Sequence, residues 1–326
     1  MTCLSDSFQR PINYLRISVT DRCDLRCVYC VPPEGMSFLP RSEILTYEEI
    51  CTVVEAATHL GISKIRLSGG EPLTRAGIVE LIKMLAHIKG IDDLSLTTNG
   101  MLLEELAADL KLTGLKRVNV SLDTLREDRF QAITGRDGLQ KVFRGLKSAQ
   151  KAGLEPIKVN MVVMRDENDD EIPDFARKSI EEGWHVRFIE LMPFAQPSTP
   201  IPQFMSVSEI RERLETLGTL EPDDSIRGNG PARYFRFPGA NGTIGFISPV
   251  SEHFCFGCNR LRLTADGKLR PCLLDEAEID LRPALRFKDR SWLEMLIRRA
   301  IADKPRQHQL SDGRTPGGRA MTQIGG

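Results

Sequence analysis

The sequence predicts a parallel α/β fold built from strand–helix units, followed by a C-terminal region organised differently. Apolar segments typical of strands alternate with amphipathic helical segments six times before residue 195 of this 326-residue chain. This alternation is typical of a parallel sheet. Beyond that point the pattern changes to a proline-rich stretch and pairs of short strands. Six units are too few for a complete eight-stranded barrel, so an open partial barrel and a doubly wound sheet remain as alternatives.

The first part of the chain is expected to contain six strands and the helices between them. The strands are predicted at residues 12–18, 63–68, 93–98, 116–122, 156–164 and 185–192. The helices are predicted at residues 46–61, 76–88, 102–114, 139–153 and 172–183. Thr46 and Glu49 have the spacing of a capping box at the start of the first helix, and Gly61 is placed to end it.

The second part is expected to begin with a linker, AQPSTPIPQ, because proline interrupts regular structure. A short helix, two hairpins and a last helix are predicted at residues 208–217, 234–248, 259–273 and 290–303. Asn241-Gly242 and Asp266-Gly267 are suited to the hairpin turns. The glycine-rich terminal stretch from Asp312 is expected to be mobile when the site is empty. We therefore divide the chain into residues 1–195 and 196–326.

Charge and composition argue against several classes of protein. The chain has 44 basic and 45 acidic side chains, whereas proteins that bind nucleic acids or membrane surfaces usually carry excess basic charge. We expect neither partner. No apolar run approaches the roughly 18–20 residues that span a bilayer, and the first residues lack the pattern of a secretory signal. A cytoplasmic protein is expected, in a compartment where disulfides are rare.

Unusual residues follow the predicted strands at their C-terminal ends. They are the cysteine-rich loop at residues 23–30, Gly69-Gly70-Glu71, the run from Thr97 to Gly100, Ser121 to Asp123, and Met192-Pro193. Each is ordinary for a loop when taken alone. Because binding groups of parallel α/β folds gather at this edge of the sheet, the five together predict one site.

Three cations lie among apolar residues of the predicted strands: Arg16, Arg66 and Lys158. A parallel strand is usually covered on both faces, and a buried cation needs a partner. An acidic neighbour such as Glu71 or Asp123 could serve as that partner. An anionic ligand such as a phosphate chain is the alternative, and convergence of all three cations on one cavity would favour it.

Six of the eight cysteines form two groups of three. The groups are Cys23, Cys27 and Cys30 at C-x3-C-x2-C spacing, and Cys255, Cys258 and Cys272 at C-x2-C-x13-C spacing. Four thiolates would complete a zinc site or a 4Fe–4S cluster, whereas three leave one iron open to another ligand. Zinc with His253 as a fourth ligand is the alternative for the second group.

The first group resembles the signature of the radical S-adenosylmethionine (SAM) superfamily. CDLRCVYC has the superfamily's spacing and its aromatic residue before the last thiol, and Gly69-Gly70-Glu71-Pro72 resembles its Gly-Gly-Glu motif. The resemblance implies that Cys23, Cys27 and Cys30 hold a 4Fe–4S cluster whose open iron binds SAM. SAM is then cleaved to methionine and a 5′-deoxyadenosyl radical.

From Ile12 to Gly326 the chain resembles the GTP 3′,8-cyclase family, lyases of molybdenum cofactor biosynthesis. The segments that carry the resemblance are RISVTDRCDLRCVYC, IRLSGGEPL, LTTNG, NVSLD, KVN, FIELMP, CNRLRLTADGKLRPC and the final Gly-Gly. The resemblance implies an incomplete (βα)6 TIM-like barrel of the radical SAM type, with a C-terminal α+β extension that carries a second 4Fe–4S cluster.

The resemblance also implies roles for individual residues. The residues implied to contact SAM are Tyr29, Gly70, Ser121 and Met192. The residues implied to bind GTP are Arg16, Arg66, Thr97, Lys158, Arg260, Leu261 and Arg262. Cys255, Cys258 and Cys272 are implied to hold the second cluster, with its open iron toward guanine. The tail residues Gly325 and Gly326 are implied to enter the active site.

The implied reaction begins when the 5′-deoxyadenosyl radical takes the C3′ hydrogen of GTP. C3′ then bonds to C8 of guanine, and an electron and a proton complete the product, (8S)-3′,8-cyclo-7,8-dihydroguanosine 5′-triphosphate. The family suggests a homodimer and transfer of the product to cyclic pyranopterin monophosphate synthase. The alternatives are a two-cluster radical SAM enzyme acting on a peptide, which usually has a longer cysteine-rich C-terminal segment, and a zinc-binding interaction protein.

Overall fold

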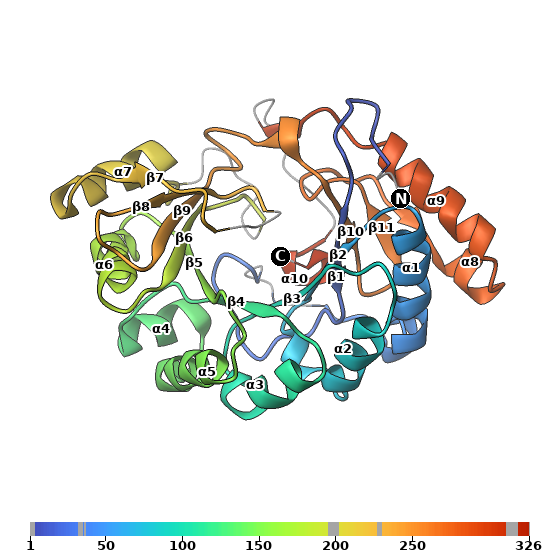
Figure 1. Cartoon of the computed structure of the whole chain (residues 1–326), viewed down its shortest axis with the longest axis horizontal. Coiled ribbons are helices and arrows are strands. Elements are labelled where there is room, and N and C mark those ends of the chain that lie inside the picture. Colours follow the sequence, from blue (N-terminus) through green and yellow to red (C-terminus); the bar gives the residue numbers. More distant parts are fainter. Residues whose placement is uncertain are drawn as a thin grey trace.

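The computed structural model describes residues 4–31, 35, 37–194, 202–226, 230–310 and 319–325. These residues form one 12-stranded sheet in the order β12-β11-β10-β1-β2-β3-β4-β5-β6-β9-β8-β7. The sheet curves around a central space, and helices cover its outer side (Figure 1). No pairing joins the two edge strands β7 and β12 within the described ranges, so the barrel is open.

Six parallel strands form the centre of the sheet, as the sequence predicted. They are β1 (Tyr14–Ser18), β2 (Lys64–Ser68), β3 (Asp93–Thr98), β4 (Arg117–Ser121), β5 (Lys158–Val163) and β6 (His185–Glu190). Each pairs in parallel with the next along the chain. Their C-terminal ends therefore meet at one rim of the barrel, which places the loops that follow them together.

The five helices predicted between these strands are confirmed. They are α1 (Tyr47–His59), α2 (Ile78–Ala86), α3 (Leu103–Leu112), α5 (Leu139–Lys151) and α6 (Ile172–Glu181). The capping box of the first is also confirmed, since the Thr46 hydroxyl accepts from the Glu49 N–H and the Glu49 carboxylate accepts from the Thr46 N–H. Short 3₁₀ helices lie at Arg41–Glu43, Pro72–Thr74, Asp169–Glu171, Glu215–Leu217 and Cys255–Gly257.

One helix, α4 (Glu127–Thr134), was not predicted. Its sequence EDRFQAIT is mostly polar, and Phe130, Ile133 and Thr134 are its buried residues. A single short apolar face gives little periodicity to recognise. The helix matters for the site because the carbonyls of Ile133 and Thr134 hold the cysteine loop, as described below.

The C-terminal region extends the same sheet at both edges. Its elements are α7 (Val207–Leu214), β7 (Glu221–Pro222), β8 (Arg233–Arg236), β9 (Thr243–Ile247), β10 (Arg260–Leu263), β11 (Lys268–Arg270), β12 (Ile279–Asp280), α8 (Arg282–Arg286), α9 (Arg290–Ala302) and α10 (Met321–Ile324). The β8–β9 and β10–β11 hairpins are antiparallel, as predicted.

Two of these hairpin strands also pair in parallel with the barrel, β9 with β6 and β10 with β1. The continuous run of parallel strands is thus longer than the six that the sequence indicated. Turn motifs reveal a hairpin locally, but they contain no information about which sheet edge it joins. The division at residues 195 and 196 stays a prediction, and most of the expected linker lies outside the described residues.

The described part of the C-terminal tail, residues 319–325, lies inside the barrel. Helix α10 contacts β1, and Figure 1 places it near the centre of the barrel. Ile324 is buried in an apolar cluster with Phe194, Leu274 and Leu310. The expected mobility of the stretch from Asp312 falls partly on residues 312–318, which lie outside the described residues. No helix that the structure describes is long and apolar enough to cross a membrane.

Candidate functional site

The two cysteine groups line one cavity inside the barrel, at the C-terminal ends of the strands. All six thiols contribute to its lining, which also includes Arg16, Arg66, Thr97, Arg260 and Arg262. The four residues predicted to contact SAM line it as well: Tyr29, Gly70, Ser121 and Met192. The cavity has a volume of about 300 Å³ with the tail in place. Residues from both halves of the chain thus meet at the site that the strand ends predicted.

Helix α4 holds the first cysteine loop at the rim. The N–H of Arg26 donates to the Thr134 carbonyl at 2.7 Å, and the N–H of Val28 donates to the Ile133 carbonyl at 3.0 Å. Burial raises the pKa of the Cys23 thiol to about 12, and it raises that of Cys30 to about 12 as well. Thiols with such pKa values are protonated at neutral pH unless a cation binds them, so metal binding here would release protons.

The Gly-Gly-Glu segment fixes the loops next to this cysteine group. The Glu71 carboxylate accepts hydrogen bonds from the Leu73 N–H at 3.0 Å, the Thr98 hydroxyl at 2.8 Å and the Asn99 N–H at 2.6 Å. Burial raises the pKa of Glu71 to about 7. A side chain at Gly70 would meet the Arg22 carbonyl oxygen at 2.3 Å. The backbone can therefore pass this close to the cysteine loop only because residue 70 is glycine.

Tyr29 connects the cysteine loop to the opposite side of the cavity. Its hydroxyl donates to one oxygen of Asp123 at 2.7 Å, and the other oxygen accepts from the Val162 N–H at 2.8 Å. Burial raises the pKa of Asp123 to about 6. Both Tyr29 and Asp123 line the cavity.

The second cysteine group is held by two buried cations. The Arg10 guanidinium donates to the Cys255 carbonyl at 2.6 Å. The Lys304 ammonium donates to the carbonyls of Arg260 at 2.8 Å and Pro271 at 2.6 Å. Arg260 lies two residues after Cys258, and Pro271 directly precedes Cys272.

The zinc alternative for this group finds no geometric support. His253 packs against His308, with ring centroids 5.6 Å apart, and it is not among the residues that line the cavity. Within the described ranges, no three His, Cys, Asp or Glu side chains are arranged to hold a single metal ion. Thiolates that bind different irons of a cluster lie further apart than ligands that each lie about 2.3 Å from one zinc ion. The arrangement is therefore compatible with an iron–sulfur cluster.

Five cations lie on adjacent or nearby strands of the barrel, and all of them except the partly exposed Arg16 are buried. We call Arg262, Arg16, Arg66, Lys158 and Arg187 the cation belt. The first three are in register on adjacent strands, with Arg16 paired to Arg262 on one side and to Arg66 on the other. Their side chains therefore stand side by side on the inner face of the sheet. Lys158 and Arg187 continue the belt on β5 and β6.

None of the belt cations forms an ion pair with a carboxylate in the part of the chain that the structure describes. Their partners are neutral. Arg16 and Arg66 donate to the hydroxyls of Ser68 and Ser95, each at 3.2 Å. Arg187 donates to the Asn119 side-chain oxygen at 2.8 Å. Glu71 and Asp123 have the partners given above, so the internal salt bridges considered from the sequence are not present.

Burial and mutual repulsion make this belt costly. Burial, then the charges of Arg187, Arg117 and Arg66, lower the pKa of Lys158 to about 6. Burial is also the main cause that lowers the pKa of Arg66 to about 10. Three buried polar atoms of the cavity lining have no hydrogen-bond partner among the residues that the structure describes: Asn160 Oδ1, Arg187 Nε and Arg260 Nε. An anionic ligand with hydrogen-bonding groups would balance the buried positive charge and would also supply partners for these polar atoms.

Four predicted site residues differ from the rest in their placement. Leu261 is fully buried in the main apolar core, so its backbone alone remains available to a ligand. Lys158 does not line the cavity, so the convergence considered from the sequence holds for Arg16 and Arg66 but not for Lys158, whose ammonium lies 5.1 Å from the centre of the Tyr234 ring. The Gly325 carbonyl accepts from Arg262 at 2.6 Å, and Gly326 lies outside the described residues.

Sequence reasoning missed Arg187, Asn160 and Lys304. Arg187 gives the same signal as Lys158, a cation inside an apolar strand, and could have been found in HVRFIELM. Asn160 lies two residues after Lys158 and therefore faces the same side of β5. Lys304 follows α9 and gives no local signal, since its contacts are with residues more than thirty positions away.

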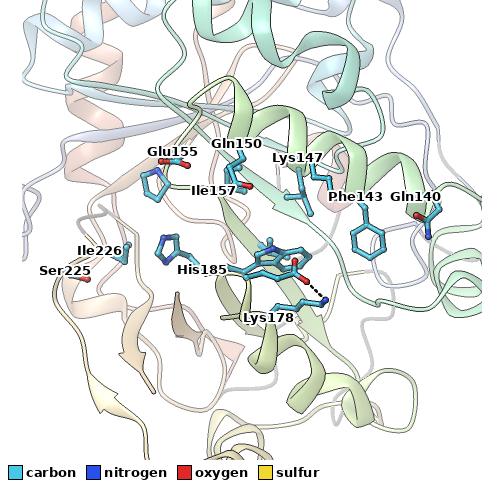
Figure 2. A pocket seen from close by; sticks show the side chains of 16 residues that line it. Gln140, Phe143, Lys147, Gln150, Glu155, Ile157, Lys178, His185, Ser225 and Ile226 are labelled. Carbon is cyan, nitrogen blue, oxygen red and sulfur yellow. Dashed lines mark hydrogen bonds and ion pairs between the residues drawn. The ribbon is translucent and has the colours of Figure 1, made fainter. Parts of the chain in front are cut away.

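A second, larger cavity of about 930 Å³ lies elsewhere, near α5, α6 and the starts of β5 and β6 (Figure 2). Trp184, His185, Lys147 and Lys178 are among its lining residues. It contains none of the clustered cysteines and none of the belt cations. Lys178 is paired with Glu182 at 2.5 Å.

Two family models match the chain. The model of the radical SAM superfamily matches residues 17–178, and the model described as Molybdenum Cofactor Synthesis C matches residues 184–310. The first contains Cys23, Cys27 and Cys30, and the second contains Cys255, Cys258 and Cys272.

Curated relatives match over nearly the whole chain. A GTP 3′,8-cyclase of Moorella thermoacetica is 50% identical, covering 99% of this chain and 100% of the relative. A GTP 3′,8-cyclase of Pelotomaculum thermopropionicum is 51% identical with the same coverage. One of Thermodesulfovibrio yellowstonii is 53% identical, covering 87% of this chain and 88% of the relative.

Solved structures of low identity share the fold. Streptococcus suis SuiB bound to S-adenosylmethionine has a TM-score of 0.60 at 16% identity, covering 86% of this chain and 65% of that chain. Native anSMEcpe with bound AdoMet has a TM-score of 0.59 at 17% identity, covering 90% and 81%. These likenesses confirm the α/β fold of the radical SAM type.

Proposed function

This chain belongs to the GTP 3′,8-cyclase family of the radical SAM superfamily, and we propose that it converts GTP into (8S)-3′,8-cyclo-7,8-dihydroguanosine 5′-triphosphate. This reaction is the first step of molybdenum cofactor biosynthesis. The observation that carries the substrate assignment is the cation belt. Its five members have no carboxylate partner among the described residues, all but Arg16 are buried, and all but Lys158 line the cavity that also contains both three-cysteine groups.

An iron–sulfur cluster and SAM are the cofactors of the radical SAM family, and the first cysteine group fits them. Three thiols line the cavity and a fourth does not follow. Cys23, Cys27 and Cys30 would hold a 4Fe–4S cluster with one open position. Tyr29, Gly70, Ser121 and Met192 would contact SAM. When bound, the cluster and SAM together supply a 5′-deoxyadenosyl radical that takes the C3′ hydrogen of GTP.

The second cysteine group also fits a 4Fe–4S cluster. This group also lines the cavity, through Cys255, Cys258 and Cys272. Three thiols would leave one iron of the cluster open, and the buried cations beside them would balance the charge of the thiolates. We assign them the second cluster, with its open position available to the guanine base. Arg260 has an unpartnered Nε and flanks this group, which suits it to bind a polar atom of the same ligand.

The cation belt would bind the triphosphate. Arg16, Arg66 and Arg262 are adjacent and can donate several parallel N–H groups to phosphate oxygens. We assign Lys158 and Thr97 to GTP with Arg260 and the backbone of Leu261, and we add Arg187 and Asn160 because they line the same cavity. Fixing both ends of GTP would hold C3′ close to C8, and such positioning can lower the barrier by several kcal/mol.

The tail would complete the site from the C-terminal end. Gly325 has a left-handed backbone conformation, and a side chain there would meet the Ser68 hydroxyl at 2.7 Å. The Ser68 and Ser18 region lies at the ends of β1 and β2. Because only glycine fits this position, we assign Gly325 and Gly326 a direct role in closing the active site around the substrate.

The cellular setting is also proposed from the family. We propose a cytoplasmic homodimer that passes its product to cyclic pyranopterin monophosphate synthase.

The test of the function is anaerobic turnover. Reconstituted protein is incubated with SAM, a strong reductant and either GTP or ATP, and 5′-deoxyadenosine and the nucleotide product are quantified by mass spectrometry. We expect 5′-deoxyadenosine release that depends on GTP, is weak with ATP and is lost in Cys27→Ala. Equal release with and without GTP would contradict the substrate assignment and would redirect the search to peptides.

A further inference from the structure

Lys304 is a buried cation at the second cysteine group. Its exposed fraction is 3%, and its ammonium donates to the carbonyls of Arg260 at 2.8 Å and Pro271 at 2.6 Å. Lys304 also lines the cavity beside the thiols of Cys258 and Cys272. Since an ammonium has three donors, two N–H groups are used by the backbone and one remains for this group of thiols.

Together with Arg10, this side chain fixes the backbone near all three cysteines. Arg10 donates to the carbonyl of Cys255 itself at 2.6 Å, and Lys304 donates to carbonyls near Cys258 and Cys272. These contacts join segments far apart in the chain, because Arg10 lies before β1 and Lys304 after α9. The three cysteine positions are therefore set by two cations rather than by one continuous loop.

The two cations differ in how their charge is balanced. Arg10 forms an ion pair with Asp6 at 2.6 Å. Lys304 forms no ion pair with a carboxylate within the described residues, and the neighbouring Arg260 adds positive charge. An unbalanced buried ammonium is costly. The nearest groups that could balance it are the thiolates of the cluster that we propose here.

A cluster held by three thiolates is such a counter-ion. A doubly positive 4Fe–4S core with three thiolates has a net negative charge, and reduction adds another. A fixed cation beside the cluster stabilises the more negative state, and charge and hydrogen bonds near the sulfurs are known determinants of cluster potential.

We propose that Lys304 is the positioning residue of the second cluster, holding the Cys258 and Cys272 segments in place and raising the reduction potential of the cluster. The proposal rests on the proposed function only in that it requires the second cluster. Substitutions can distinguish the two effects. Holding the backbone requires N–H donors at residue 304, whereas raising the reduction potential requires a positive charge there.

The experiment isolates the second cluster. In a variant of the full chain with Cys23, Cys27 and Cys30 all changed to alanine, any remaining iron and sulfide belongs to the second group. Lys304→Met, Lys304→Gln and Lys304→Arg are then compared in this background after anaerobic reconstitution. Lys111→Met is the matched control, since Lys111 is an exposed lysine that also donates to a backbone carbonyl, that of Gly153. Iron, sulfide and the midpoint potential are measured by redox titration.

We expect Lys304→Met to bind less than half of the iron of its parent. Lys304→Gln keeps donors but lacks the charge, so we expect it to retain more iron with a reduction equilibrium at least tenfold less favourable, about 59 mV lower for a one-electron couple. Lys304→Arg and Lys111→Met should match the parent. Thermal melting of each variant identifies any that fail to fold. If Lys304→Met does not fold, the comparison of Lys304→Gln with Lys304→Arg tests the effect of the charge on the potential.

Two different results would overturn different statements. Unchanged iron content and potential in Lys304→Gln and Lys304→Met would overturn the role of Lys304 while leaving the second cluster in place. Absence of iron and sulfide from the parent itself would overturn the second cluster, and with it the role of Lys304, without affecting the assignment of the first group.

Discussion

Replacing Arg319 with alanine should release the C-terminal tail from the barrel. The Arg319 guanidinium donates to both oxygens of Asp266, at 3.1 and 2.9 Å, and to Glu278 at 2.9 Å, with its Nε 2.7 Å from the other Glu278 oxygen. Asp266 lies in the turn between β10 and β11. This network therefore joins the tail to the hairpin that carries Arg262 and precedes Cys272.

The burial of the three side chains sets the size of the effect. The side chains of Arg319, Asp266 and Glu278 are 16%, 8% and 21% exposed. Removing one partner of a fully buried ion pair costs about 3–5 kcal/mol, whereas an exposed pair contributes at most about 1 kcal/mol. Because these side chains are partly buried, we expect Arg319→Ala to reduce the free energy of tail docking by about 2–3 kcal/mol. This loss shifts the equilibrium between docked and free tail roughly 30- to 150-fold toward the free form.

The same contact predicts a pH dependence. Burial by itself would raise the pKa of Asp266, but hydrogen bonds from Arg319 and Thr264 lower it below its ordinary value. A carboxyl with a lowered pKa stabilises the docked tail fully above its ordinary pKa of about 3.9, and this contribution is lost as the pH falls below that value. Acid should therefore weaken tail docking in the native protein, and Arg319→Ala should remove most of this dependence.

Hydrogen exchange followed by mass spectrometry measures tail docking without any need for activity. We expect amides in residues 319–325 to lose protection in Arg319→Ala, by a factor close to the shift in docking. Arg299→Ala is the control, because Arg299 forms an exposed pair with Asp303 at 3.4 Å. Equal protection of the tail in Arg319→Ala and the native protein would refute the reasoning.

Three further predictions concern the cavity. Lys158→Met should raise the KM for GTP at least tenfold, because a phosphate bound nearby would favour the charged ammonium and a charged hydrogen bond contributes about 1.5–3 kcal/mol; it should also raise the melting temperature of the ligand-free protein at neutral pH, since burial lowers the pKa of Lys158 to about 6 and loss of the lysine proton on folding costs free energy, and a lower melting temperature would contradict this. Gly70→Ala should reduce the iron held by the first cysteine group, because the new Cβ would meet the Arg22 carbonyl oxygen at 2.3 Å; iron analysis in a variant without the second group tests this. Residues appended after Gly326 should suppress cyclisation, as measured by product formation, and full activity of the extended protein would count against a role of the tail.

The sequence predicted the barrel strands well because each is a continuous apolar segment bounded by turn residues. It predicted the cysteine groups and the unpaired cations Arg16, Arg66 and Lys158 for a related reason, since each departs from the surrounding pattern within a few residues. The site was located from the common edge at which the parallel strands end. The strand, cysteine and cation signals can each be recognised within a few residues. The position of the site follows from the rule that binding groups gather at the C-terminal ends of parallel strands.

What the sequence did not reveal depends on contacts between distant segments. The parallel pairing of β9 with β6 and of β10 with β1 is formed by residues more than fifty positions apart, and hairpin motifs do not specify it. Helix α4 was missed because it has few apolar residues. Lys304 was missed because its proposed role depends on contacts with carbonyls that are distant in the sequence. A lysine after a helix is ordinary until those contacts are known.

The fold by itself does not identify the substrate. Streptococcus suis SuiB bound to precursor peptide SuiA has a TM-score of 0.62 to this chain at 16% identity, and one fold can serve many substrates. The interior of the barrel gives the stronger argument. A neutral peptide segment would leave the belt cations buried and unbalanced, at a cost of several kcal/mol for each unpaired ion. A ligand that carries a chain of phosphates removes this cost and supplies acceptors for Arg16, Arg66 and Arg262 in register. The substrate of this barrel must therefore bring negative charge of its own, as a nucleoside triphosphate does.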